Sequence, residues 1–136
     1  MGTDIRADIS KKNRYWISKH RYYELKHFCM QYKDWKKLYL LSLSNEKGAV
    51  SNRKNIEWLD PTGSAVARSE LYLDRIRLIE GCANEAGGEF GEYILKAATE
   101  GKTYAVLRTN YYIPCNRKDF YERYRKFFYI LSLLRK

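Results

Sequence analysis

The sequence has few of the residues that support disulfide or metal chemistry. Its 136 residues include three cysteines, Cys29, Cys82 and Cys115, and two histidines. The cysteines are odd in number, far apart and without C-x-x-C spacing, which argues against a disulfide framework or a zinc site. His20 and His27 are seven residues apart, and we interpret them as surface or half-buried side chains. We therefore expect no metal and no cofactor.

Long apolar runs are also absent. A membrane-spanning helix needs about 20 consecutive apolar residues, and no stretch of this chain reaches that length. The first residues do not show the apolar segment of a signal peptide. We therefore expect a soluble, intracellular protein that does not enter a membrane. Its length is enough for one domain, residues 1–136, with a hydrophobic core of its own.

Common catalytic motifs are missing as well. The sequence contains no GxSxG, no HExxH and no GxxxxGK[ST] loop. "AGGEFGEY" (86–93) has glycines, but no strand precedes them, and we interpret it as a helix end rather than a phosphate-binding loop. Cys115 precedes a predicted helix N-terminus, a position expected to lower a thiol pKa, but no histidine partner is evident. We expect a protein that is not an enzyme.

Positive charge is abundant and unevenly distributed. The net charge is +10, and residues 1–56 hold 13 Lys and Arg against 5 Asp and Glu. Residues 57–100 reverse this balance with 4 against 9, and residues 102–136 hold 9 against 2. Cations grouped in two blocks favour a protein that binds a polyanion such as nucleic acid. The alternative is an ordinary solvated basic surface.

The spacing of apolar residues predicts an all-α fold of five to six helices. Apolar residues recur every three to four positions over most of the chain, and no segment shows a convincing strand alternation. Residues 44–55, rich in Ser, Asn, Gly and Lys, are a predicted loop. Ser18 is a predicted N-cap, as is Thr62 or Ser64. The predicted helices are 18–31, 33–43, 65–86, a short one within 89–101, another within 102–112, and one from Asn116 to about Leu134. The first two are alternatively one bent helix, because neither Gly nor Pro separates them.

Net charge and the spacing of apolar residues divide the chain into three parts. Residues 1–56 form a basic, aromatic-rich helical part, and residues 57–101 form an acidic helical middle. Residues 102–136 form two helices interrupted by Pro114, whose ring stops a helix and disfavours helical backbone at the preceding residue. This last part is a candidate helix–turn–helix unit. The helix of 65–86 is expected to bury Ala67, Leu71, Ile76, Leu78, Ile79, Cys82 and Ala86.

The last helix is amphipathic. It has an apolar stripe that we expect to be buried and a set of cations on its other faces, the division that a DNA recognition helix requires. Asn116 is either its cap or a base reader. An ordinary solvated face is the alternative for any single cation. The stripe is Phe120, Tyr124, Phe127, Phe128, Leu131 and Leu134; the predicted DNA-binding residues are Thr103, Arg108, Arg117, Lys118, Tyr121, Arg125 and Lys126.

The segment "GKTYAVLRTNYYIPCNRKDFYERYRKFFYILSLL" resembles the C-terminal helix–turn–helix of small phage and prophage transcription regulators. These are the RinA/ArpU-type late-gene activators of Gram-positive bacteria, related to region 4 of sigma factors. The resemblance depends on Tyr104, Leu107, the "YIP" turn and the basic run "RYRKFF" (123–128). It implies a regulator that binds double-stranded DNA in the cytoplasm of a bacterial host. Tyr112 departs from the pattern, since a small residue is common there.

Two other functions stay open at this point. A structural or packaging accessory protein of a phage would use the aromatic side chains for protein–protein contacts, and a small nuclease would need a carboxylate cluster that holds Mg²⁺. The aromatic-rich N-terminal part either packs within the chain or forms a homodimer. Any exposed aromatic residues there are candidate contacts for a partner such as host RNA polymerase.

Overall fold

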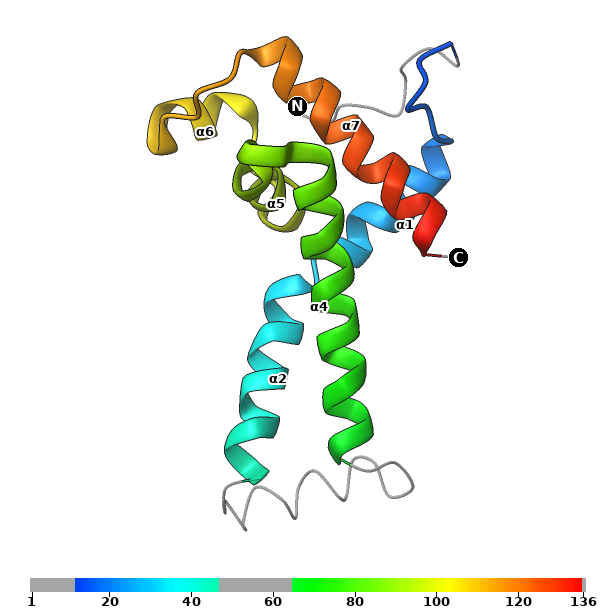
Figure 1. Cartoon of the computed structure of the whole chain (residues 1–136), viewed down its shortest axis with the longest axis vertical. Helices are drawn as coiled ribbons and strands as arrows, with labels where there is room; N and C mark the ends of the chain where they lie inside the picture. Colours follow the sequence, from blue (N-terminus) through cyan, green and yellow to red (C-terminus); the bar gives the residue numbers. More distant parts are fainter. Residues whose placement is uncertain (1–11, 47–64, 136) are drawn as a thin grey trace. The chain divides into compact units, whose positions relative to one another are not determined.

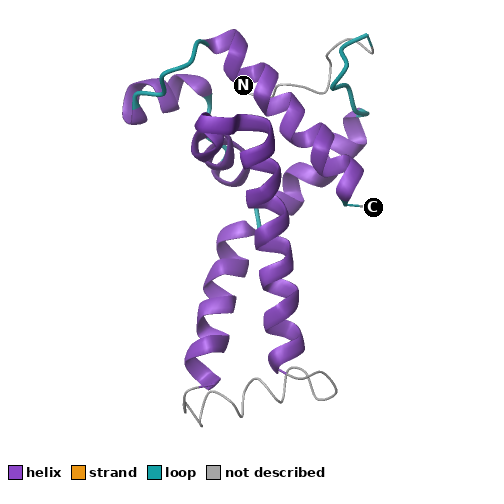
Figure 2. Cartoon of the chain, viewed as in Figure 1, coloured by secondary structure: helices purple, strands orange, loops and turns teal. Residues whose placement is uncertain are grey.

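The computed structural model describes residues 12–46 and 65–135, and its regular elements within these ranges are all helices (Figure 1, Figure 2). The predicted all-α class is confirmed there. The helices are α1 (Lys19–Cys29), α2 (Tyr32–Glu46), α4 (Ala65–Gly87), the short 3-10 helix η1 (Gly88–Phe90), α5 (Gly91–Glu100), α6 (Tyr104–Tyr111) and α7 (Arg117–Leu134).

The helix ends follow local sequence signals closely. Ser18 caps α1 as predicted, its hydroxyl oxygen accepting a hydrogen bond from the Arg21 amide at 3.2 Å. Gly88 ends α4 with a positive φ of 56°. The predicted loop 44–55 is wrong for its first three residues, because α2 continues to Glu46; propensity alone is a weak guide at a helix end. The rest of that loop and the predicted caps at 62 or 64 lie outside the described residues.

The described residues divide into two compact units. The first comprises the chain up to Gln31 and from Leu78 onward, and the second is Tyr32–Arg77. α4 contributes its early turns to the second unit and its later turns to the first. This division follows packing, whereas the three sequence parts follow charge, and the single domain stays a prediction.

The first unit has its core between α1, α5 and α7, with α6 against α7 (Figure 1). The stripe of α7 supplies much of this core, and its residues from Phe120 to Leu131 are buried as predicted. Leu134 is the exception, since it is 62 % exposed. Periodicity identifies the side of a helix that is buried, but not how far the neighbouring elements extend along it. The largest fully buried side chains include Leu25, Ile79, Ile94, Leu107, Phe120, Phe127, Phe128 and Leu131.

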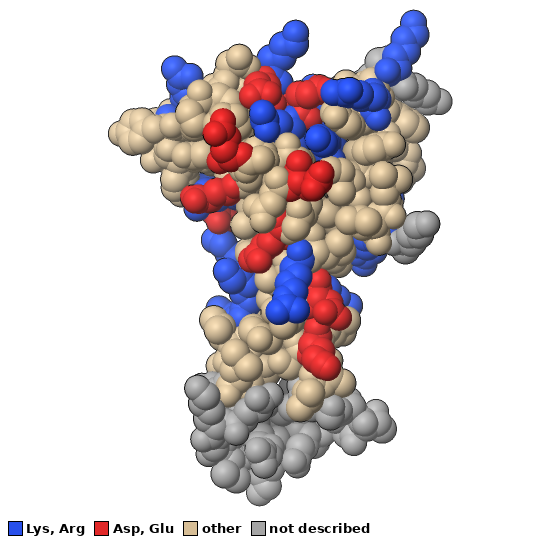
Figure 3. Space-filling model, viewed as in Figure 1, with Lys and Arg blue, Asp and Glu red and all other residues tan. Residues whose placement is uncertain are grey.

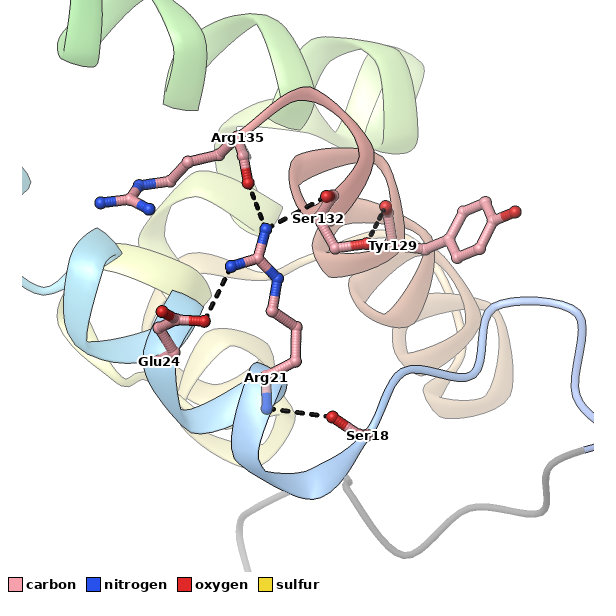
Figure 4. Close-up of polar contacts among 6 residues, drawn as sticks. All are labelled: Ser18, Arg21, Glu24, Tyr129, Ser132 and Arg135. Carbon is pink, nitrogen blue, oxygen red and sulfur yellow. Dashed lines mark hydrogen bonds and ion pairs between the residues drawn. The ribbon is translucent and has the colours of Figure 1, made fainter.

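Arg21 joins the start of α1 to the end of α7 (Figure 4). Its guanidinium donates to the Ser132 carbonyl at 3.1 Å and to the Arg135 carbonyl, and it forms an ion pair with Glu24 at 2.7 Å. The last carbonyls of a helix have no partner within the helix, and they carry partial negative charge. A cation from another helix therefore satisfies them, and it fixes the two helix ends together.

The second unit pairs α2 with the early turns of α4. The hydroxyl oxygens of Ser42 and Ser69 are hydrogen-bonded at 3.1 Å, and the Arg75 guanidinium lies 5.1 Å from the Trp35 ring centre. The later residue of α2, Ser42, meets the earlier residue of α4, Ser69, whereas the earlier Trp35 meets the later Arg75. The two helices are therefore antiparallel. The apolar residues of the early turns are not all buried.

The predicted buried stripe of α4 is wrong at its beginning. Ala67 and Leu71 are exposed, whereas Ser69 and Ile76, seven residues apart, are buried. Leucines occur on several sides of this segment, so the pattern did not identify the side that meets α2. In the described part of the chain, no helix combines the length and apolar character needed to cross a membrane.

Candidate nucleic-acid interface

The connection between α6 and α7 depends on a helix cap at each end. α6 ends at Tyr112, which has a left-handed backbone with φ 54° and ψ 44°. The amides of Tyr112 and Ile113 both donate to the Leu107 carbonyl, that of Ile113 at 3.3 Å. α7 starts after Asn116, whose side-chain oxygen accepts from the Asp119 amide at 2.8 Å. Asn116 is therefore a cap, the first of its two predicted roles.

Tyr104 holds this connection against the start of α7. Its hydroxyl donates to the Cys115 carbonyl at 2.7 Å, and its ring centre lies 5.5 Å from that of Phe120. Tyr104, Cys115 and Phe120 are all buried. One side chain of α6 thus contacts both the segment that connects the two helices and the first helical turn of α7. These contacts hold the N-terminus of α7 against α6.

Three of the predicted DNA-binding residues gather around Tyr104. Arg108 donates to the Tyr104 hydroxyl at 3.3 Å, and the Arg117 guanidinium lies 5.8 Å from the Tyr104 ring centre and 5.5 Å from that of Tyr121. Such cation–π contacts orient a guanidinium without neutralising it. Arg108 and Arg117 are exposed. We call these four residues (Tyr104, Arg108, Arg117 and Tyr121) the tyrosine–arginine cluster.

The other predicted cations of α7 differ in accessibility. Lys118 is exposed and has no ion pair or hydrogen bond of its side chain with any described residue. Arg125 is half-buried, 3.6 Å from the Glu122 carboxylate, and its Nε is buried without a hydrogen-bond partner among the described residues. Lys126 is half-buried and one turn from Glu122. The most accessible positive charge is therefore at the start of α7.

Thr103 has a role within the fold. It caps α6, and its hydroxyl oxygen accepts from the Val106 amide at 3.3 Å. A hydroxyl that caps a helix keeps its own hydrogen available, so a phosphate contact by Thr103 stays a prediction.

Two lysines that sequence reasoning did not select lie over the ring of Tyr111 in α6. The Lys96 ammonium lies 4.8 Å from the Tyr111 ring centre, and that of Lys102 lies 5.9 Å from it. Lys96 is on α5 and Lys102 is in the turn before α6. They are 15 and 9 residues away from Tyr111 in sequence, so only the packing of α5 against this part of the chain could associate them with it.

Arg123, in contrast, is committed to the fold. It donates to the Gly87 carbonyl at 2.7 Å and to Asp119 at 3.1 Å, and its guanidinium lies 4.9 Å from the Phe90 ring centre. These contacts attach α7 to the end of α4 and to η1. The "RYRKFF" run therefore does not present all of its cations to a partner.

The cysteines are buried thiols. The expectation of a lowered pKa for Cys115 is wrong, because burial, and secondarily the Asp119 carboxylate, raise the pKa of this thiol. Burial also raises the pKa of Cys82, to about 11, and that of Cys29. A raised pKa disfavours the reactive thiolate. Within residues 12–46 and 65–135, no group of three His, Cys, Asp or Glu side chains is arranged to hold a metal ion.

The surface charge is mixed. On the face shown in Figure 3, Lys and Arg side chains lie among Asp and Glu side chains instead of forming one uninterrupted basic area. The candidate interface is therefore a local one, consisting of the tyrosine–arginine cluster and Lys118. Comparisons with protein-family models, with curated proteins and with solved structures found no match, so the resemblance to phage regulators remains an expectation.

Proposed function

We propose that this protein binds double-stranded DNA through the first turns of α7 and the adjoining cations of α6. The observation that carries the proposal is that α7 buries one set of its side chains and exposes cations at its start. Its apolar stripe is buried from Phe120 to Leu131 in the core of the first unit, while Arg117 and Lys118 are exposed at its N-terminus. A helix held in this way can enter the major groove with its early residues while the rest of the helix keeps the domain in place.

The tyrosine–arginine cluster supports the same interpretation. Arg108 and Arg117 are held on Tyr104 by a hydrogen bond and a cation–π contact. A guanidinium that is already oriented loses less conformational freedom when it binds a phosphate or the edge of a guanine. In biological terms we propose a transcription regulator of phage or prophage origin, in keeping with the resemblance of the C-terminal segment, and host RNA polymerase is a candidate partner.

Replacing Lys118 with alanine tests the proposal. Binding to duplex DNA is expected to weaken at every salt concentration, and the slope of log K against log[salt] is expected to fall by about 1, because one phosphate contact is lost. Fluorescence anisotropy with a labelled duplex over a series of salt concentrations measures both quantities. The matched control is Lys37→Ala, an exposed lysine of α2 in the second unit, which is expected to leave the slope unchanged.

If the protein does not bind duplex DNA at low salt, the proposed function is excluded. Equal slopes for Lys118→Ala and Lys37→Ala would move the interface away from α7. If the protein does bind duplex DNA, selection of bound sequences from random duplexes would define its operator sequence.

A second candidate function is protein–protein contact by the second unit. Several large apolar side chains are exposed there: Leu38, Leu40, Leu41, Val66 and Leu71. Apolar groups exposed close together are typical of interaction surfaces, and a phage structural or packaging protein, or a homodimer, would use such a surface. We expect Leu40→Lys combined with Leu41→Lys to abolish any oligomer seen by sedimentation. An oligomer that persists in this variant would exclude these leucines as its contact.

A further inference from the structure

Tyr112 has a backbone conformation that does not suit its side chain. Its φ of 54° is the one positive φ of a non-glycine residue in the described parts of the chain. For L-residues with a Cβ, this left-handed region is strained, and glycine is the usual residue at such a helix end. Glycine would adopt this backbone without strain, so the fold itself does not require a tyrosine here. Such local strain often occurs where the side chain has a function.

The same chain provides a comparison at Gly101. This residue follows α5 as Tyr112 follows α6, with a left-handed φ of 70°; its amide donates to the carbonyl four residues earlier, whereas that of Tyr112 donates to the carbonyl five residues earlier. At that helix end the sequence uses glycine, which has no Cβ to strain. A tyrosine in the equivalent position after α6 is therefore not required by the geometry of the turn.

The Tyr112 side chain also contributes little to packing. It is 82 % exposed, and it has no aromatic contact and no side-chain hydrogen bond with the described residues. Its neighbour Tyr111 is different, since the ammonium groups of Lys96 and Lys102 lie over that ring. The ring of Tyr112 is thus an open aromatic surface on a short turn between two helices.

Two arginines flank this turn in the sequence. Arg108 lies one turn before Tyr112 and Arg117 lies just after the turn, and both are held on Tyr104. Exposed aromatic rings among cations are the usual means of binding nucleic acid outside the duplex stack, because bases stack on the rings while the cations attract phosphates. An apolar protein surface would instead have to desolvate these charges.

We propose that Tyr112 is a base-stacking residue, and that the site favours DNA with an unpaired base beside the duplex that α7 binds. The inference rests on the proposed function, since the cations that would hold the duplex are the same. It adds a ligand class, a nucleobase outside the double-helical stack, and it accounts for the strained backbone.

Tyr112→Gly is the decisive variant, because it removes the ring and suits the left-handed backbone. We expect the wild-type protein to bind a duplex with a short central unpaired region about tenfold more tightly than the fully paired duplex, from the usual strength of base–aromatic stacking. Tyr112→Gly is expected to lose this preference, to bind the paired duplex as the wild type does, and to melt at the same or a higher temperature. Tyr112→Phe should keep the preference. Fluorescence anisotropy and thermal unfolding supply the measurements.

The outcomes separate this inference from the proposed function. If Tyr112→Gly keeps the wild-type preference, or if the wild type has none, base stacking is overturned while duplex binding stands. If the wild-type protein binds neither DNA, the proposed function fails, and the inference fails with it. If Tyr112→Gly changes the sedimentation behaviour but leaves DNA binding unaltered, Tyr112 is a protein contact and the inference is overturned.

Discussion

Phe127→Ala is expected to destabilise the protein by about 3–5 kcal/mol, the usual cost of removing a fully buried aromatic ring. Phe127 is 0 % exposed, and its ring meets that of Phe128 edge to face with centres 4.9 Å apart. It lies in the middle of α7, the helix that contacts α1, α5 and α6. The cavity would therefore lie in the core of the first unit, and domains of this size are stable by only about 5–15 kcal/mol.

Urea unfolding followed by far-UV circular dichroism measures this loss. Leu134→Ala is the matched control, since Leu134 belongs to the same helix but is largely exposed, and we expect it to change the free energy of unfolding by less than about 0.5 kcal/mol. Similar effects of the two substitutions would mean that α7 is not packed through the stripe described above.

Tyr104→Phe is expected to cost about 1–3 kcal/mol of stability although it removes a single oxygen atom. The Tyr104 hydroxyl donates to the buried Cys115 carbonyl and accepts from Arg108. Without the hydroxyl, that carbonyl stays buried and loses a hydrogen bond, and an unsatisfied buried polar group carries most of its desolvation penalty. The ring itself remains against Phe120, so the loss reports on the hydrogen bonds.

The control for this substitution is Tyr121→Phe. Tyr121 is half-buried in the same cluster, and its hydroxyl makes no hydrogen bond with any described residue. We expect the free energy of unfolding of Tyr121→Phe, measured in urea, to stay within about 0.5 kcal/mol of that of the wild type. If Tyr104→Phe is equally mild, then Tyr104 does not fix the connection to α7. The position of Arg108 and Arg117 would then need another explanation.

Much of the local structure could be predicted from the sequence because its determinants are local. Ser18 and Asn116 begin helices, and Gly88 and Gly101 end them, through contacts within a few residues. The stripe of α7 was predicted correctly up to Leu131 because its phenylalanines and Leu131 all recur on one side of the helix. The early turns of α4 have apolar residues on several sides, and the prediction for Ala67 and Leu71 was wrong.

The candidate site was predictable in composition but not in arrangement. The density of cations in residues 102–136 identified Arg108, Arg117 and Lys118 as candidates. Nothing in their spacing indicated that Arg108 and Arg117 share Tyr104, or that Arg123 binds the Gly87 carbonyl instead of facing outward. Each of these contacts joins elements whose mutual position depends on packing.

By itself, the sequence determined the all-α class, most helix ends and the amphipathic character of α7, since caps, glycines and periodicity act over one or two turns of chain. Only the tertiary structure decided which cations remain accessible, which thiols are buried and where an aromatic ring is left open at Tyr112. Those properties depend on which surfaces the helices cover. Covering a surface is a long-range effect of the hydrophobic core, and no local pattern encodes it.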